Sequence, residues 1–100
     1  MDDRKLFIYM TTNMIDGKRY IGQHKGYEYD GYLRSGVRIV NAIKKYGKEN
    51  FKREIICYCN TQEELDEQEI YWIKYYDAAR RGDFYNIAEG EGMALVKLQD

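Results

Sequence analysis

Two short stretches rich in aromatic and β-branched residues, separated by a turn sequence, constrain the fold of this chain most. Residues 6–12 and 19–24 both have the composition of β-strands. Asp16-Gly17 between them is typical of a tight hairpin turn. Because side chains alternate across a strand, each strand carries one set of residues on a common face: Phe7, Tyr9 and Thr11 on the first, and Tyr20, Gly22 and His24 on the second. The sequence predicts a β-hairpin but leaves open its register, which decides whether the two faces coincide.

The rest of the chain reads as a loop, a helix, a strand and a second helix. Residues 25–36 contain three glycines and predict an irregular loop. A helix is expected over 37–46, with Gly47 as its stop and one apolar face made of Val37, Val40, Ile43 and Tyr46. Residues 51–59 alternate as a third strand, and the capping box at 61–64 begins a helix that runs to about Ala79. A short closing segment follows at 84–88.

This order of elements predicts an α+β fold, a small three-stranded antiparallel sheet flanked by helices. One hundred residues allow one domain over 1–100, with a core of about 5–88 and a C-terminal tail at 89–100. The apolar runs are too short for a membrane span, and the acidic start lacks a signal-peptide core, so we expect no membrane and a cytoplasmic location.

Cys57 and Cys59 fit buried free thiols better than a zinc site.

Charge is unevenly distributed although the net charge is only −1. Residues 31–55 hold seven bases and two acids, whereas residues 61–70 hold five acids and no base. A basic segment can face nucleic-acid phosphates, and it can equally be a solvated helix surface. Four bases could neutralise a phosphate: Arg34 and Arg38, at or near a helix N-terminus, and Lys18 and Lys25, on either side of the second strand.

Glu69 lies on an apolar helix face. At about 100° per residue it falls in one stripe with Leu65, Trp72 and Tyr76. A buried carboxylate must be paired, protonated or bound to a cation. The pattern alone leaves a metal ligand and a structural salt bridge equally open.

Proton transfer could involve Tyr9, Tyr20 and His24 together. A phenol titrates near 10, so activation of water by a tyrosine needs a neighbouring cation or base. His24 could accept the phenol proton or contact a phosphate, and a solvent-exposed histidine at a strand end is the equally open alternative. With eleven tyrosines in the chain, simple packing is the competing interpretation for each one. Asn86 fits either a functional position or a turn.

These residues in this order resemble the GIY-YIG nuclease family. Phe7-Ile8-Tyr9 is similar to its first motif, Tyr20-Ile21-Gly22 to its second, Glu69 before Tyr71-Trp72-Ile73 to its metal-binding glutamate, and Asn86 to its late asparagine. Residues 42–51 resemble a segment of phage-type homing endonucleases. One position differs: family members commonly carry an arginine about ten residues after the second motif's tyrosine, and this chain has Asp30 there.

The resemblance implies a Mg²⁺-dependent (or Mn²⁺-dependent) endonuclease that hydrolyses DNA phosphodiester bonds in a bacterial or phage-infected cell. Catalysis would fall to Tyr9, Tyr20 and Glu69, with the metal on Glu69. His24 and Arg34 complete the expected catalytic set, and Arg34, Arg38 or His24 would stand in for the arginine that is missing at position 30. DNA would contact Lys18, Gly22, Arg38 and Asn86. No other acid of the second helix is expected beside Glu69, so metal binding without DNA should be weak. A monomer is favoured, and the tail is too short for a DNA-reading domain. The alternatives are an inactive DNA-binding descendant of the fold and a tyrosine-rich partner-binding module.

Overall fold

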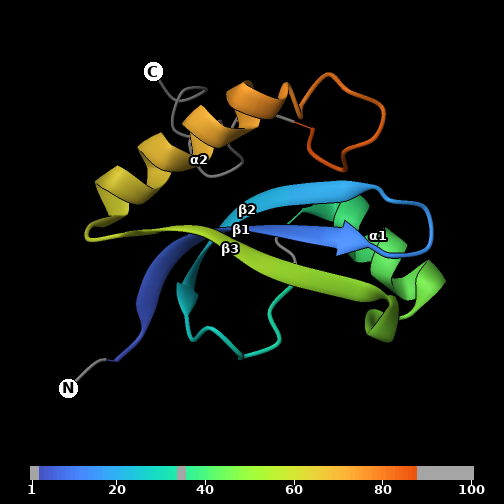
Figure 1. Cartoon of the computed structure of the whole chain (residues 1–100), viewed down its shortest axis with the longest axis horizontal. Helices are drawn as coiled ribbons and strands as arrows, with labels where there is room; N and C mark the ends of the chain where they lie inside the picture. Colours follow the sequence, from blue (N-terminus) through green and yellow to red (C-terminus); the bar gives the residue numbers. More distant parts are fainter. Residues whose placement is uncertain (1–2, 34–35, 88–100) are drawn as a thin grey trace.

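A computed structural model describes residues 3–33 and 36–87. In chain order the elements are β1 (Lys5–Asn13), β2 (Arg19–Gly26), α1 (Val37–Tyr46), the 3₁₀ turn η1 (Lys48–Asn50), β3 (Phe51–Cys59) and α2 (Gln62–Tyr76). The three strands form one antiparallel sheet in the order β2-β1-β3. Helix α2 lies across one face of this sheet and α1 lies on the other side (Figure 1). The predicted fold class is confirmed.

The hairpin register is the feature that matters most for the site. Tyr9 of β1 lies opposite Gly22 of β2, with Phe7 opposite His24 and Thr11 opposite Tyr20. The two faces identified in the sequence therefore coincide. Gly17 has φ of +80°, which explains why glycine follows Asp16 in the turn. Strand β2 extends two residues beyond the predicted end, to Gly26.

Two hydrophobic clusters sandwich the sheet. The cluster on the α1 side contains the aromatic residues of the hairpin together with Leu33, Ile39, Ala42, Phe51 and Tyr85. The cluster on the α2 side contains Ile8, Ile21, Cys59, Leu65, Ile73, Ala78 and Phe84. Odd and even positions of β2 thus serve different layers, with Ile21 on the α2 side and Tyr20 on the α1 side.

The predicted face of α1 was partly wrong. Val37 is 68% exposed, and the buried residues are Ile39 and Ala42, with Ile43 and Tyr46 packed beside them. The helix has apolar residues on more than one side, so its contact with the sheet decides which of them are buried. Gly47 ends the helix, as predicted, and its positive φ of +92° is one that glycine adopts readily.

Helix α2 begins where predicted and ends earlier. The Thr61 hydroxyl accepts a hydrogen bond from the Glu64 backbone N–H, at 3.1 Å. The helix stops at Tyr76 rather than Ala79, because Asp77 adopts a left-handed conformation and the Ala78 N–H bonds back to the Ile73 carbonyl. Within the described ranges, no helix combines the length and apolar character needed to cross a membrane.

Both cysteines are free, as predicted. Cys59 is buried, and this burial, followed by the neighbouring Cys57 and Glu64, raises its pKa to about 12. A thiol with so little thiolate character suits a packing role.

Candidate functional site

The two motif tyrosines meet over Gly22. Tyr9 and Tyr20 are both completely buried, with their ring centroids 6.2 Å apart. A Cβ added to Gly22 would lie 2.6 Å from the Tyr9 hydroxyl oxygen and 2.9 Å from Cε2 of Tyr20. The Tyr9 phenol therefore packs directly against Gly22. A side chain at this position is excluded by overlap with Tyr9 and Tyr20, not by the backbone conformation.

Complete burial limits what these tyrosines can do in the conformation described. Tyr32 packs edge-on against Tyr9, with ring centroids 6.0 Å apart, and Leu33 belongs to the same cluster. For either motif hydroxyl to meet a water molecule or a phosphate, the side chains around it must open a path. The arrangement fixes the phenols in place but does not present them to solvent.

His24 lies next along the same face of β2 and is held on three sides. Its Nε2 is 2.7 Å from Oδ2 of Asp30. Its ring stacks on Tyr32 with centroids 3.9 Å apart, and it meets Phe7 edge-on at 5.6 Å. The imidazole is thus a rigid part of the tyrosine cluster, one ring away from Tyr9.

Arg53 is the residue of this cluster that sequence reasoning missed. It lies on β3, opposite Thr11, and its guanidinium sits over the rings of Phe7 and Tyr9, at 5.0 and 5.9 Å from their centroids. Its side chain is only 6% exposed, and it forms a 3.2 Å ion pair with Asp30. A signal was present in the sequence, because Arg53 falls between Phe51 and Ile55 on one face of an alternating strand.

Glu69 lies on the opposite side of the sheet. It is 1% exposed on α2, one turn from both Leu65 and Ile73, which confirms that a carboxylate sits within the buried helix face. Its Oε1 accepts a hydrogen bond from Nε2 of Gln23, at 3.1 Å. Gln23 points to the α2 side of β2, whereas the motif tyrosines pack on the α1 side, so edge strand β2 separates the two halves of the expected site.

The expectation that no other acid of α2 lies beside Glu69 was wrong. Oδ1 of Asp66 accepts from the same Nε2 of Gln23 at 2.9 Å, and Gln62 also donates to Asp66. Two carboxylates, one helical turn apart, thus converge on a single amide. The sequence could not show this, because the convergence depends on Gln23 reaching α2 from β2.

This donor set fits a hard divalent cation. Within residues 3–33 and 36–87 no group of three or more His, Cys, Asp or Glu side chains converges on one point. Mg²⁺ prefers oxygen ligands and keeps several waters, so a pair of carboxylates suits it better than it would suit Zn²⁺.

Asn86 connects the closing segment to the outer edge of β2. Its Oδ1 accepts from the Ile21 N–H at 2.9 Å, and its Nδ2 donates to the Ile21 carbonyl at 2.8 Å. The Tyr85 N–H bonds to the Arg19 carbonyl in the same line. Asn86 therefore completes the edge of the strand that carries Tyr20 and Gly22, with both ends of its amide already used.

The remaining expected DNA contacts are peripheral. Lys18 is exposed, with its ammonium 5.6 Å from the centre of the Tyr85 ring. Arg38 is exposed on the first turn of α1. Arg34 and the expected tail at 89–100 lie outside the described residues.

Comparison with known proteins agrees with this architecture. A family model, the GIY-YIG catalytic domain, matches residues 5–82. The endonuclease candidates segD and segE of Enterobacteria phage T4 are 43% and 44% identical over 99 and 97 residues, covering 96% and 94% of this chain. The chain spans less than half the length of these relatives, 44% and 46% respectively. A mutant of the catalytic domain of the intron endonuclease I-TevI superposes with a TM-score of 0.65, at 23% identity over 85% of this chain and 95% of that one.

Proposed function

The chain belongs to the GIY-YIG family, and from this we propose that it is the catalytic module of a metal-dependent endonuclease that hydrolyses DNA phosphodiester bonds. The observation that carries the proposal is the Glu69 carboxylate, buried on α2 beside Asp66, against the opposite face of the sheet from the motif tyrosines. We also propose that it acts in the cytoplasm of a bacterial or phage-infected cell. We favour a monomer.

In hydrolysis the oxygen of water forms a new bond to phosphorus, and the bond to the leaving sugar oxygen breaks. Once the side chains packed around them open a path, Tyr9 and Tyr20 orient that water, and His24 takes its proton. The leaving oxygen takes a proton from solvent. Arg34, Arg38 and Lys18 offset the phosphate charge. Gly22 and Asn86 are buried, so they contribute to DNA binding by fixing the shape of β2.

Glu69, with Asp66 beside it, would hold Mg²⁺ or Mn²⁺. The ion supplies positive charge for the oxygens that become more negative as the bond breaks. With so few protein ligands, we expect millimolar or unmeasurable Mg²⁺ affinity without DNA and tighter binding with a non-cleavable duplex.

Plasmid nicking in Mg²⁺ tests the proposal. The cleavage rate of Glu69→Gln should be at least about 100-fold lower than that of the parent, which is the effect expected from removing a group that stabilises transition-state charge. Glu67→Gln is the matched control, because Glu67 is exposed on the same helix. This variant should cleave like the parent. Equal cleavage by the Glu69 variant and the parent would rule out the metal role.

A second candidate is an inactive DNA-binding descendant of the fold. It is favoured by the complete burial of Tyr9 and Tyr20, and by an ion-paired acid at position 30 in place of the arginine that the family resemblance implies. This candidate predicts salt-dependent DNA binding by the parent with no cleavage in Mg²⁺ or Mn²⁺.

A further inference from the structure

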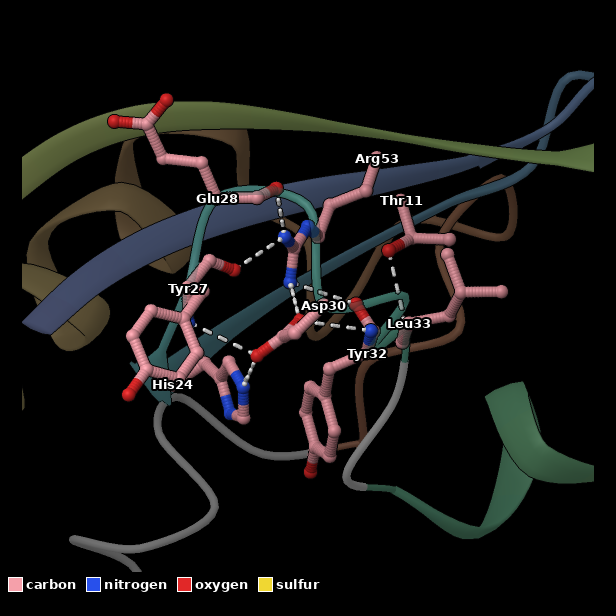
Figure 2. A network of polar contacts seen from close by, with 8 residues as sticks. All are labelled: Thr11, His24, Tyr27, Glu28, Asp30, Tyr32, Leu33 and Arg53. Carbon is pink, nitrogen blue, oxygen red and sulfur yellow. Dashed lines mark hydrogen bonds and ion pairs between the residues drawn. The ribbon is translucent and has the colours of Figure 1, made fainter. Parts of the chain in front are cut away.

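The loop from Tyr27 to Tyr32 is wrapped around one guanidinium group (Figure 2). Nη1 of Arg53 donates to the Tyr32 carbonyl at 2.9 Å and to Oδ1 of Asp30 at 3.2 Å. Nη2 donates to the carbonyls of Tyr27, at 3.1 Å, and Glu28. Four acceptors in two directions match the planar fork of arginine, which an ammonium group cannot reproduce.

Asp30 lies at the centre of this network, between Arg53 and His24 (Figure 2). Oδ1 accepts from Arg53 and from the Tyr32 backbone N–H at 3.0 Å. Oδ2 meets the Tyr27 backbone N–H at 3.0 Å and Nε2 of His24 at 2.7 Å. Burial opposes ionisation, but the Tyr32 N–H, His24 and the Tyr27 N–H together hold the pKa of the Asp30 carboxyl well below its usual range.

An ionised carboxylate only accepts hydrogen bonds, so the 2.7 Å contact requires the proton of His24 to be on Nε2. Nδ1 is then the basic nitrogen of the neutral ring. Stacking on Tyr32 fixes the ring plane. Among the described residues, the titratable groups in contact with this ring are Asp30 and Tyr32, both from the loop. Arg53 of β3 contacts Asp30, and Tyr9 of β1 contacts Tyr32, so each lies one residue further from the ring. The Glu28 carboxylate accepts a hydrogen bond from the Tyr58 hydroxyl.

We propose that Asp30 is a positioning residue that fixes His24 with its proton on Nε2, leaving Nδ1 as the proton acceptor in phosphodiester hydrolysis, and that Arg53 holds Asp30 in place. This inference rests on the proposed nuclease function. The water proton passes to Nδ1 as the water oxygen bonds to phosphorus, and the imidazolium so formed lies against the Asp30 carboxylate until it returns the proton to solvent.

His24 is the only histidine in the chain, which makes its protonation pattern directly measurable. Two-bond ¹⁵N–¹H spectra, recorded where the ring is neutral, should show the Nε2–H form in the parent. In Asp30→Asn an NH₂ group facing Arg53 would also face the Tyr32 N–H, and neither of these donors can become an acceptor. Facing His24, it gives up only the hydrogen bond from the Tyr27 N–H, and the ring can accept from it by switching to the Nδ1–H form, so this switch is the expected result. A parent with Nδ1–H, or a variant with an unchanged tautomer, would overturn the inference.

Kinetics provide the second measurement. Asp30→Asn and His24→Gln should each lower kcat by about 10²–10⁴-fold with little change in KM for DNA. Glu28→Gln is the matched control, since only the backbone carbonyl of Glu28 contacts Arg53, and it should match the parent in kcat and tautomer.

Arg53→Lys keeps the charge without the fork and tests the network should Asp30→Asn fail to fold. It should leave a mixture of the two tautomers and an intermediate kcat, whereas a fully parental spectrum and rate would contradict the role of Arg53. A parent that cleaves no DNA defeats the proposed function while the tautomer result stands. If Asp30→Asn switches the His24 tautomer but keeps the parental kcat, the positioning role of Asp30 in catalysis is refuted, while the proposed nuclease function is not.

Discussion

Replacing Gly22 with alanine tests the central contact between the two motif strands. The added Cβ would lie 2.6 and 2.7 Å from Oη and Cζ of Tyr9, and 2.9 Å from Cε2 of Tyr20. Favourable contacts of this kind lie near 3.5 Å or more, so the Tyr9 phenol would have to retreat by about 1 Å. It has little room to do so, because Phe7 and Tyr32 pack edge-on against its ring.

The expected loss is the balance of two effects. Overfilling a packed core costs about 1–3 kcal/mol, and two fully buried rings around one methyl group favour the upper end of that range. Alanine also restricts the unfolded chain, which offsets about 0.4–1 kcal/mol. The net result is a destabilisation of about 2 kcal/mol, or a fall in Tm of about 8–16 °C for a domain of this size.

Thermal unfolding followed by circular dichroism measures this difference. Gly82→Ala is the matched control, because a Cβ at Gly82 meets no heavy atom within 4 Å. Its free energy of unfolding should stay within about 0.5 kcal/mol of the parent. If the two variants have the same Tm, the Tyr9 phenol does not rest on Gly22, and the steric explanation of the second motif's glycine is wrong.

Two further predictions concern the edge of β2 and the response to acid. Asn86→Ala should cost about 2–4 kcal/mol, because both the N–H and the carbonyl of Ile21 lose their partners. Asn41→Ala on the exposed side of α1 is the control and should change the urea midpoint little. The folded-state pKa of Asp30 is lowered, so its contribution to stability is present above the ordinary carboxyl pKa of about 4 and is lost as the pH falls below it. Asp30→Asn should therefore flatten the acid limb of the stability curve, and an unchanged limb would show that other carboxyls dominate it.

The hairpin and its faces could be predicted because a strand has a period of two, and Asp16-Gly17 marks the turn. The predicted face of α1 was less accurate for an equally physical reason. Val37 and Val40 extend its apolar surface beyond the side that meets the sheet, so periodicity alone allowed two orientations. Packing of Ile39 and Ala42 against the aromatic cluster decides between them.

Glu69 was found in the sequence because a carboxylate inside an apolar helix stripe is costly, and the structure confirms its burial. Asp66 was missed because it belongs to the flank of the same stripe. Only the arrival of Gln23 from the neighbouring strand draws its carboxylate toward Glu69. A helix pattern predicts which residues share a face, but it says nothing about a partner that crosses from another element.

Arg53 is the strongest example of a contact that a pattern within one element cannot predict, and it also indicates how such contacts could be anticipated. Its partners lie 21–26 residues upstream in a loop of no regular pattern, so no local rule could connect them. A charged residue between Phe51 and Ile55 on one strand face nevertheless predicts a buried charge, as Glu69 does on its helix. A buried guanidinium, like a buried carboxylate, needs a partner, and for a guanidinium that partner is an acceptor. The acid at position 30 supplies it. Asp30, standing where the family resemblance implies an arginine, and an arginine arriving from β3 are therefore two parts of one electrostatic arrangement. A change of either residue alone would leave a largely buried charge without its partner.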